Sequence, residues 1–206
     1  MKYNNTGMEL LPLHLWKNKE ADAGSVIYLF YDYTSLEGCR RLLHQWFEAA
    51  FAEEYVWKNT PANLLYFYER FEILLYGCWL LYTGSKNLTA KHTRSVSAGS
   101  IKLSPLSAHM AERVEVFKFL TAYEMQNPLS VLQQFFNRLD LYAWQKELHN
   151  WIEAALGRQT ITQINDTRNL LPVMEQLNKL AEAAWLINQA HLHELMIRKE
   201  KKRRVK

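Results

Sequence analysis

Apolar residues recur at helical spacing along much of the chain. Leu36, Leu43 and Phe47 fall on one side of a helix, and Leu64 with Phe71 begins a second stripe of the same kind. A stripe that repeats every three or four residues is typical of a helix that packs one face against a core. The pattern therefore predicts a chain of amphipathic helices.

The helical pattern occurs twice. Residues 25–51 align without a gap on residues 130–156, and 10 of the 27 positions are identical. One inserted residue later, residues 63–82 align on residues 169–188, with 7 of 20 positions identical. Self-similarity at a fixed offset is a property of architecture, because a repeated sequence builds a repeated structural unit.

The repeat decides the interpretation of one ambiguous segment. Residues 25–33, SVIYLFYDY, are rich in β-branched and aromatic side chains and by themselves resemble a strand. Their counterpart, residues 130–138, follows Asn127 and Pro128 and contains two glutamines in a helical context. We expect both segments to be short helices, each followed by a middle helix and a long aromatic helix.

The sequence thus predicts an all-α fold, a single domain in which units 25–82 and 130–188 are related by an approximate twofold. Only 7 Gly and 5 Pro are present and 49% of residues are hydrophobic, a composition that favours helices around a sizeable core. Repeated Trp46 with Trp151 and Trp79 with Trp185 are expected to fill the seams between helices.

Capping residues predict where the helices begin. Three prolines stand at first helical positions behind a capping side chain, and other caps bracket the two middle helices. The prolines with their caps are Thr60 with Pro61, Ser104 with Pro105 and Asn127 with Pro128; the middle helices have Thr34 with Glu37, Asp140 and Gly157.

The segments outside the repeats carry weaker signals. Residues 83–103, rich in Gly, Ser and Thr at their start, are expected to form an exposed linker loop. An additional helix is expected from Ser104 to Met125, and the final helix from near Asp166 into the basic run. The N-terminal segment with Pro12 and Trp16 is expected to pack irregularly or as a short helix.

Positive charge is concentrated in one place. The net charge is +4, but residues 198–206, RKEKKRRVK, hold seven bases and one acid, a local +6, which leaves −2 for residues 1–197. Clustered bases neutralise the phosphates of nucleic acid or bind an acidic protein surface, although positive charge also simply favours a helix C-terminus. The candidate contacts are Arg198, Lys199, Lys201, Lys202, Arg203, Arg204 and Lys206.

A histidine and a glutamate recur one helical turn apart in both units, as His44 with Glu48 and His149 with Glu153. Together with Glu69 and Glu175 they form the ligand inventory of dinuclear metal sites in helical bundles. The helix wheel, however, places these residues on the flank of the core or away from it, and the Glu-x-x-His spacing of such sites is absent. We therefore expect boundary residues with structural hydrogen bonds, and a metal site only as the alternative.

Other chemistry has no signature. The chain contains no Gly-rich phosphate loop, Cys-x-x-Cys, His-Glu-x-x-His or Gly-x-Ser-x-Gly motif. The apolar run from Ile73 to Tyr82 is too short to span a bilayer. Cys39 and Cys78 align with apolar residues, which predicts buried, reduced thiols and a cytoplasmic location.

Three functional hypotheses remain. The first is a non-enzymatic interaction or regulatory protein without a cofactor, which binds a protein partner. The second is a nucleic-acid-associated protein that uses the basic run, with the bases around Lys86, Lys91 and Arg94 as a further contact. The third is a metal-dependent oxidoreductase that uses His44, Glu48, His149 and Glu153.

Overall fold

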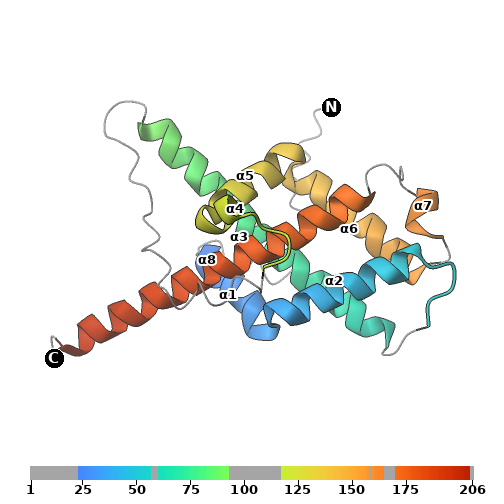
Figure 1. Cartoon of the computed structure of the whole chain (residues 1–206), viewed down its shortest axis with the longest axis horizontal. Coiled ribbons are helices and arrows are strands. Elements are labelled where there is room, and N and C mark those ends of the chain that lie inside the picture. Colours follow the sequence, from blue (N-terminus) through green and yellow to red (C-terminus); the bar gives the residue numbers. More distant parts are fainter. Residues whose placement is uncertain (1–22, 57–59, 93–116, 158, 165–169, 205–206) are drawn as a thin grey trace, which may run out of the picture.

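The computed structural model describes residues 23–56, 60–92, 117–157, 159–164 and 170–204 (Figure 1). Within these ranges the chain is helical, with no strand. The fold class expected from the sequence is therefore confirmed at the level of an all-α protein. The helices are α1 (Ala23–Tyr33), α2 (Leu36–Phe51), α3 (Pro61–His92), α4 (Ala122–Gln126), α5 (Pro128–Arg138), α6 (Leu141–Leu156), α7 (Ile161–Ile164) and α8 (Leu170–Arg204).

The helices pack in a recurring set of pairs. Short helix α1 lies against α3, and short helix α5 lies against α8. Each short helix also contacts the other long helix, α1 with α8 and α5 with α3, while α2 and α6 pack against each other. Where α1 meets α3, a Cβ on Gly77 would lie 2.9 Å from a side-chain atom of Ile27, so the absence of a side chain permits the close approach.

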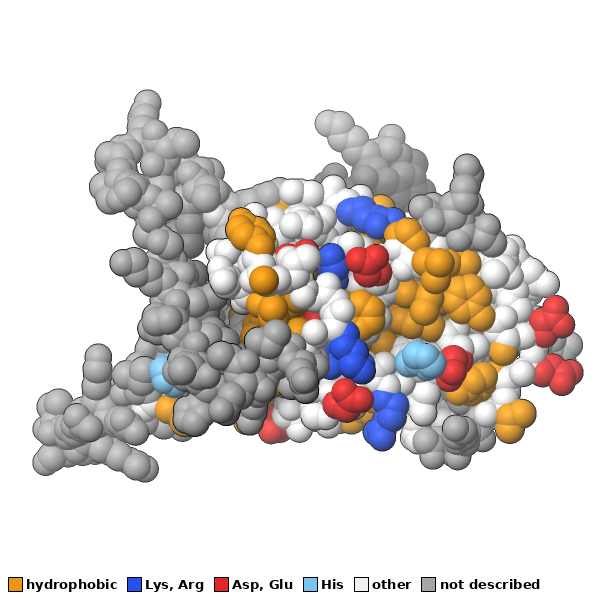
Figure 2. Space-filling model, viewed as in Figure 1, with side chains coloured by type: hydrophobic (Ala, Val, Ile, Leu, Met, Phe, Trp, Pro, Cys, Tyr) orange, Lys and Arg blue, Asp and Glu red, His pale blue; other side chains and the backbone are white. Residues whose placement is uncertain are grey.

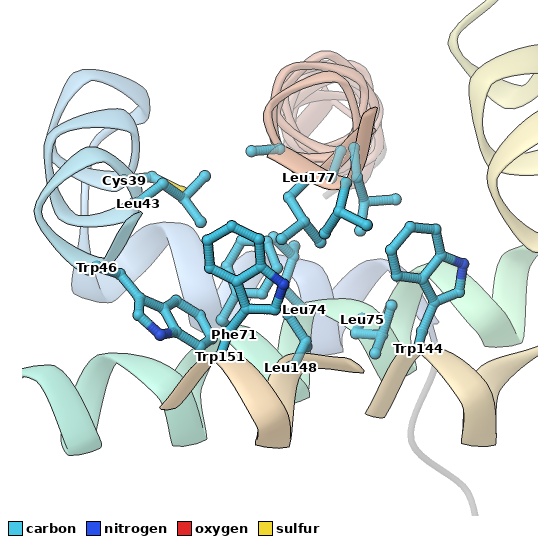
Figure 3. Packing of buried hydrophobic residues seen from close by; sticks show 14 of the residues in the cluster. Cys39, Leu43, Trp46, Phe71, Leu74, Leu75, Trp144, Leu148, Trp151 and Leu177 are labelled. Atoms are coloured by element: carbon cyan, nitrogen blue, oxygen red, sulfur yellow. The ribbon is translucent and has the colours of Figure 1, made fainter. Parts of the chain in front are cut away.

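Tryptophans occupy the centre of the core (Figure 3). Trp46, Trp144 and Trp151 are fully buried, and the Trp151 ring contacts Phe47 of α2 edge-on at a centroid separation of 5.0 Å. The predicted packing role of Trp46 and Trp151 is confirmed; Trp79 and Trp185 are partly buried against the same core. Burial of each large apolar side chain stabilises the fold by about 1.5–3 kcal/mol.

Capping side chains set the starts of the middle helices. Ser35 accepts from the amide of Gly38 at α2, and Asp140 accepts from the amide of Ala143 at α6. Asp140 was expected, whereas the capping box predicted from Thr34 and Glu37 is wrong because the neighbouring serine takes that position. Helices α3 and α5 begin at Pro61 and Pro128 as predicted, and α6 ends at its expected cap Gly157. The predicted side-chain cap at Asn127 is wrong, because that side chain makes no capping hydrogen bond to α5.

Two boundary predictions are corrected. The linker loop expected from residue 83 begins later, because α3 remains helical to His92. The Thr83 and Ser85 hydroxyls donate back to carbonyls of the preceding turn, so these polar residues are accommodated within the helix. A continuous helix from Ser104 to Met125 is also wrong, since residues 117–121 are not helical and α4 begins at Ala122.

The remaining boundary predictions fall partly outside the described residues. The final helix was expected from near Asp166; residues 165–169 are not described, and α8 is helical from Leu170 to Arg204. The N-terminal segment, the cap at Ser104 and the linker beyond residue 92 lie outside the described residues. Among the helices described, none is both long enough and apolar enough to cross a membrane.

Candidate functional site

A buried charged network links α2 to α8 and to the segment before α4. Glu182 of α8 has no exposed surface, and its Oε1 accepts from the Arg40 guanidinium. The same carboxylate accepts from three consecutive backbone amides, those of Lys118 at 2.9 Å, Phe119 at 3.1 Å and Leu120 at 3.0 Å. Glu182 therefore holds residues 118–120 against α8 through charge-assisted hydrogen bonds.

Further polar groups lie close to this network in the interior. The Tyr31 hydroxyl donates to the carbonyl of Ala181, and burial raises the pKa of Tyr31 well above its ordinary value. Cys39 and Cys78 are free and have no exposed surface, and burial raises the pKa of both thiols. Thiols in this state are poor nucleophiles, so the two cysteines act as core residues.

Arg40, Lys118 and Phe119 of this network line a groove of about 890 Å³ between α2 and α8, while Glu182 lies buried behind them. Phe47, Leu171 and Met174 contribute apolar surface to it, and charges of both signs surround them. Basic and acidic side chains stand beside hydrophobic ones on the face of the molecule that carries these helices (Figure 2). The charged and polar lining residues are Glu37, Arg40, Arg41, His44, Gln45, Glu48, Lys118, Glu175 and Asn178.

Three residues of the metal-ligand inventory line this groove. His44 Nδ1 lies 3.4 Å from Glu48 Oε1, and both side chains are more than half exposed, at 71% and 53%. Glu175 lies 3.5 Å from the Lys179 ammonium and is engaged by it. The flanking positions predicted by the helix wheel for His44 and Glu48 are confirmed, and their contact is the local one expected from a spacing of four.

The second His–Glu pair is not among the groove residues. His149 and Glu153 lie on α6 and are exposed, and Glu69 of α3 is exposed as well. Among the described residues, no three His, Cys, Asp or Glu side chains come together in a group that could hold a metal ion. Among the described residues that line the groove, none is a serine, threonine or cysteine.

The basic run lies at the far end of α8. Helix α8 starts in the core, where Leu177, Leu180 and Ala181 are fully buried, and continues as one helix to Arg204. Its C-terminal part extends away from the other described helices (Figure 1). Of the candidate contacts, Arg198 to Arg204 therefore lie on helical backbone, and Lys206 lies outside the described residues.

Sequence reasoning missed Arg40 and Glu182. Charged residues are expected on helix surfaces, and the two are separated by 142 positions, so no local spacing connects them. One signal existed: on the repeat alignment Arg40 matches Gln145 and Glu182 matches Tyr76, so the charged pair occurs where the two units differ.

Comparisons with known proteins returned nothing. No family model matches the chain, and neither the curated proteins nor the solved structures contain a match. Any functional statement therefore depends on the residues and geometry described above.

Proposed function

We propose that the protein is a non-enzymatic helical interaction module that binds a negatively charged protein partner through the basic end of α8. The observation that carries the proposal is the continuity of α8 from the buried core to Arg204. A helix anchored at one end and extended at the other presents whatever its far end carries, and residues 198–204 at that end carry a local charge of +5.

The anchoring of α8 supports this role. Glu182 connects the helix to α2 and to residues 118–120, and Asn188 is the last buried residue toward its C-terminus among those described. From Asn188 to Arg204 the helix rises by about 24 Å at 1.5 Å per residue. Residues 189–192 are partly buried, with His191 against Gly24 of α1, and the basic run begins six residues later at Arg198.

A second candidate is association with nucleic acid through the same run. Density of charge favours it, because seven bases within nine residues match the close spacing of phosphates along a strand. The two candidates differ in salt dependence and in the probe that binds. The third hypothesis, metal-dependent oxidation, gains no support from the separated positions of the two His–Glu pairs.

The test measures binding of fluorescent single-stranded RNA, duplex DNA and a polyglutamate peptide to the intact protein across salt concentrations. Binding of the acidic peptide alone supports the protein-partner proposal, and salt-dependent binding of nucleic acid supports the second candidate. Failure of all three probes to bind at low salt would remove both.

Matched variants separate the run from general surface charge. Arg203→Gln with Arg204→Gln removes two bases of the run, and Arg138→Gln with Lys146→Gln removes two exposed bases of the body. For nucleic acid, the first pair should reduce the slope of log affinity against log salt by about 1.4–1.8, since each phosphate contact contributes about 0.7–0.9. The second pair should leave the slope unchanged.

We also infer that the body arose by duplication of one helical unit and has an approximate twofold between α2 and α6. Helices α1 and α5 both have 11 residues, α2 and α6 both have 16, and each pair is offset by 105 positions. Replacing residues 42–51 by the sequence of residues 147–156 should give a folded chimera. A chimera that fails to fold while single substitutions at the same positions are tolerated would contradict the inference.

Buried free thiols support a cytoplasmic location.

A further inference from the structure

A second hollow lies between α2 and the start of α3, and Arg41 and Gln45 line both this hollow and the groove. Its volume is about 480 Å³, within the range of about 300–1,000 Å³ usual for small-ligand sites. The residues that matter for its chemistry are Tyr33, Arg41, Gln45, Tyr55, Asn63 and Tyr66. The hollow thus combines aromatic rings, amides and one cation.

The aromatic wall is held in a fixed arrangement. The Tyr33 and Tyr66 rings meet edge to face at 5.2 Å between centroids. The Arg70 guanidinium lies 4.9 Å from the centre of the Tyr66 ring and donates to the Tyr66 hydroxyl at 2.7 Å. Both tyrosines keep about two fifths of their surface exposed, at 39% and 41%. A planar ligand entering the hollow therefore meets ring surface that is already positioned.

Arg41 gives the hollow a net positive charge. Within the part of the chain that the structure describes, no carboxylate lines the hollow and Arg41 makes no ion pair. Its neighbour Arg40, in contrast, is buried and committed to Glu182. A guanidinium in this state is available for bidentate binding of a phosphate or carboxylate.

The remaining polar groups match a nucleoside. The side-chain amides of Gln45 and Asn63 each offer donors and an acceptor, the combination that hydrogen-bonds the edge of a nucleobase. The hydroxyls of Thr34 and Thr60, also in the lining, are of the type that binds ribose oxygens. The hollow therefore has groups suited to each part of a nucleotide: tyrosine rings and amides for the base, hydroxyls for the sugar and a guanidinium for the phosphate.

We propose that this hollow binds a nucleoside monophosphate group, with Arg41 on the phosphate and the tyrosine wall against the base. The group is either a free mononucleotide or the 5′ end of a strand, since both present the same chemistry. The site is independent of the basic end of α8, because none of its residues belongs to α8.

The experiment is calorimetric titration of the intact protein with AMP, adenosine, inorganic phosphate and a 5′-phosphorylated dinucleotide. Arg41→Gln should weaken binding of AMP by at least about tenfold, the loss expected for a hydrogen bond to a charged group. Tyr66→Leu should weaken AMP and leave phosphate unchanged. Arg138→Gln, which removes an exposed base of α5, should leave both unchanged.

The affinity for the 5′-phosphorylated dinucleotide, compared with that for AMP, distinguishes a strand end from a free nucleotide. Tighter binding of the dinucleotide than of AMP assigns a strand end, and the reverse assigns a free nucleotide; each supports the site if Arg41→Gln weakens it. Absence of binding by both at millimolar concentration overturns the proposal. Adenosine binding as tightly as AMP, or an Arg41→Gln effect no larger than that of Arg138→Gln, overturns it as well.

Discussion

Replacing Glu182 by Gln tests whether the buried network holds the fold together. The carboxylate accepts from Arg40 and Lys118 at Oε1 and from Phe119 and Leu120 at Oε2. An amide in its place keeps only one acceptor atom, so two of the four donors then face an NH₂ group. The Arg40 guanidinium, which is 8% exposed, also loses its buried counter-charge.

The expected loss is large for a single conservative substitution. Removing one partner of a buried ion pair costs about 3–5 kcal/mol. The Arg40 charge then stays buried, and the Glu37 carboxylate, 3.7 Å away and 79% exposed, replaces little of the lost interaction. Arg40→Met should cost less, about 1.5–3 kcal/mol, since Glu182 keeps three backbone donors. The double variant should cost less than the sum of the two, by about 0.5–3 kcal/mol, as expected for residues in one network.

Urea unfolding followed by tryptophan fluorescence measures these differences, with an unchanged m-value as the condition for comparison. Glu175→Gln is the matched control, because Glu175 lies on the same helix, is 56% exposed and pairs with Lys179; its loss should stay below about 1 kcal/mol. Hydrogen exchange should show faster exchange at the amides of Lys118, Phe119 and Leu120 in Glu182→Gln. A loss no larger than that of the control, or unchanged exchange at those three amides, would refute the reasoning.

Three further predictions concern the core. Burial raises the pKa of Glu72 to about 7, although the hydrogen bond from Tyr68 acts to lower it. The folded state therefore binds this proton more tightly than the ordinary pKa of 4.5 allows, and the free energy of unfolding should fall by at most about 3 kcal/mol as pH rises from 4.5 to 7. Chemical unfolding at several pH values should show this fall in the unmodified protein and not in Glu72→Gln. Gln145 is 1% exposed, and neither the oxygen nor the nitrogen of its side-chain amide has a hydrogen-bond partner among the described residues. Gln145→Met should therefore raise the free energy of unfolding, measured by thermal denaturation, by about 1–3 kcal/mol. A destabilised variant would contradict this. Cys39 and Cys78 should react with a thiol reagent only in denaturant, and reaction of native protein at the rate of a free thiol would show that they are accessible.

The sequence allowed the helices to be predicted because their signals are local. Apolar spacing, proline positions and Asp140 as a cap act within a few residues, and the repeat corrected the strand-like appearance of residues 25–33. The same locality explains the errors. Residues 83–92 have a loop-like composition but continue the helix begun upstream, since the hydroxyls of Thr83 and Ser85 bond to its own carbonyls.

Part of the candidate site was equally local. The contact between His44 and Glu48, and the exposure of both, follow from a spacing of four on a helix whose apolar stripe points elsewhere. The groove beside them was not predictable in this way. It requires α8 and residues 118–119 to lie next to α2, and those segments are far apart along the chain.

By itself the sequence determined an all-helical chain, the positions of most of its helices, the tryptophans that fill the core and the concentration of charge in residues 198–206. Only the tertiary structure decided that Arg40 and Glu182 are buried together and that Glu182 holds residues 118–120. It also decided that Arg41, which forms no ion pair among the described residues, lines a hollow together with three tyrosines. The physical reason is the separation along the chain over which each interaction acts. Helix formation and capping depend on neighbours within about four positions, whereas burial of a charge is tolerated only where distant segments bring the opposite charge and the hydrogen-bond donors to it.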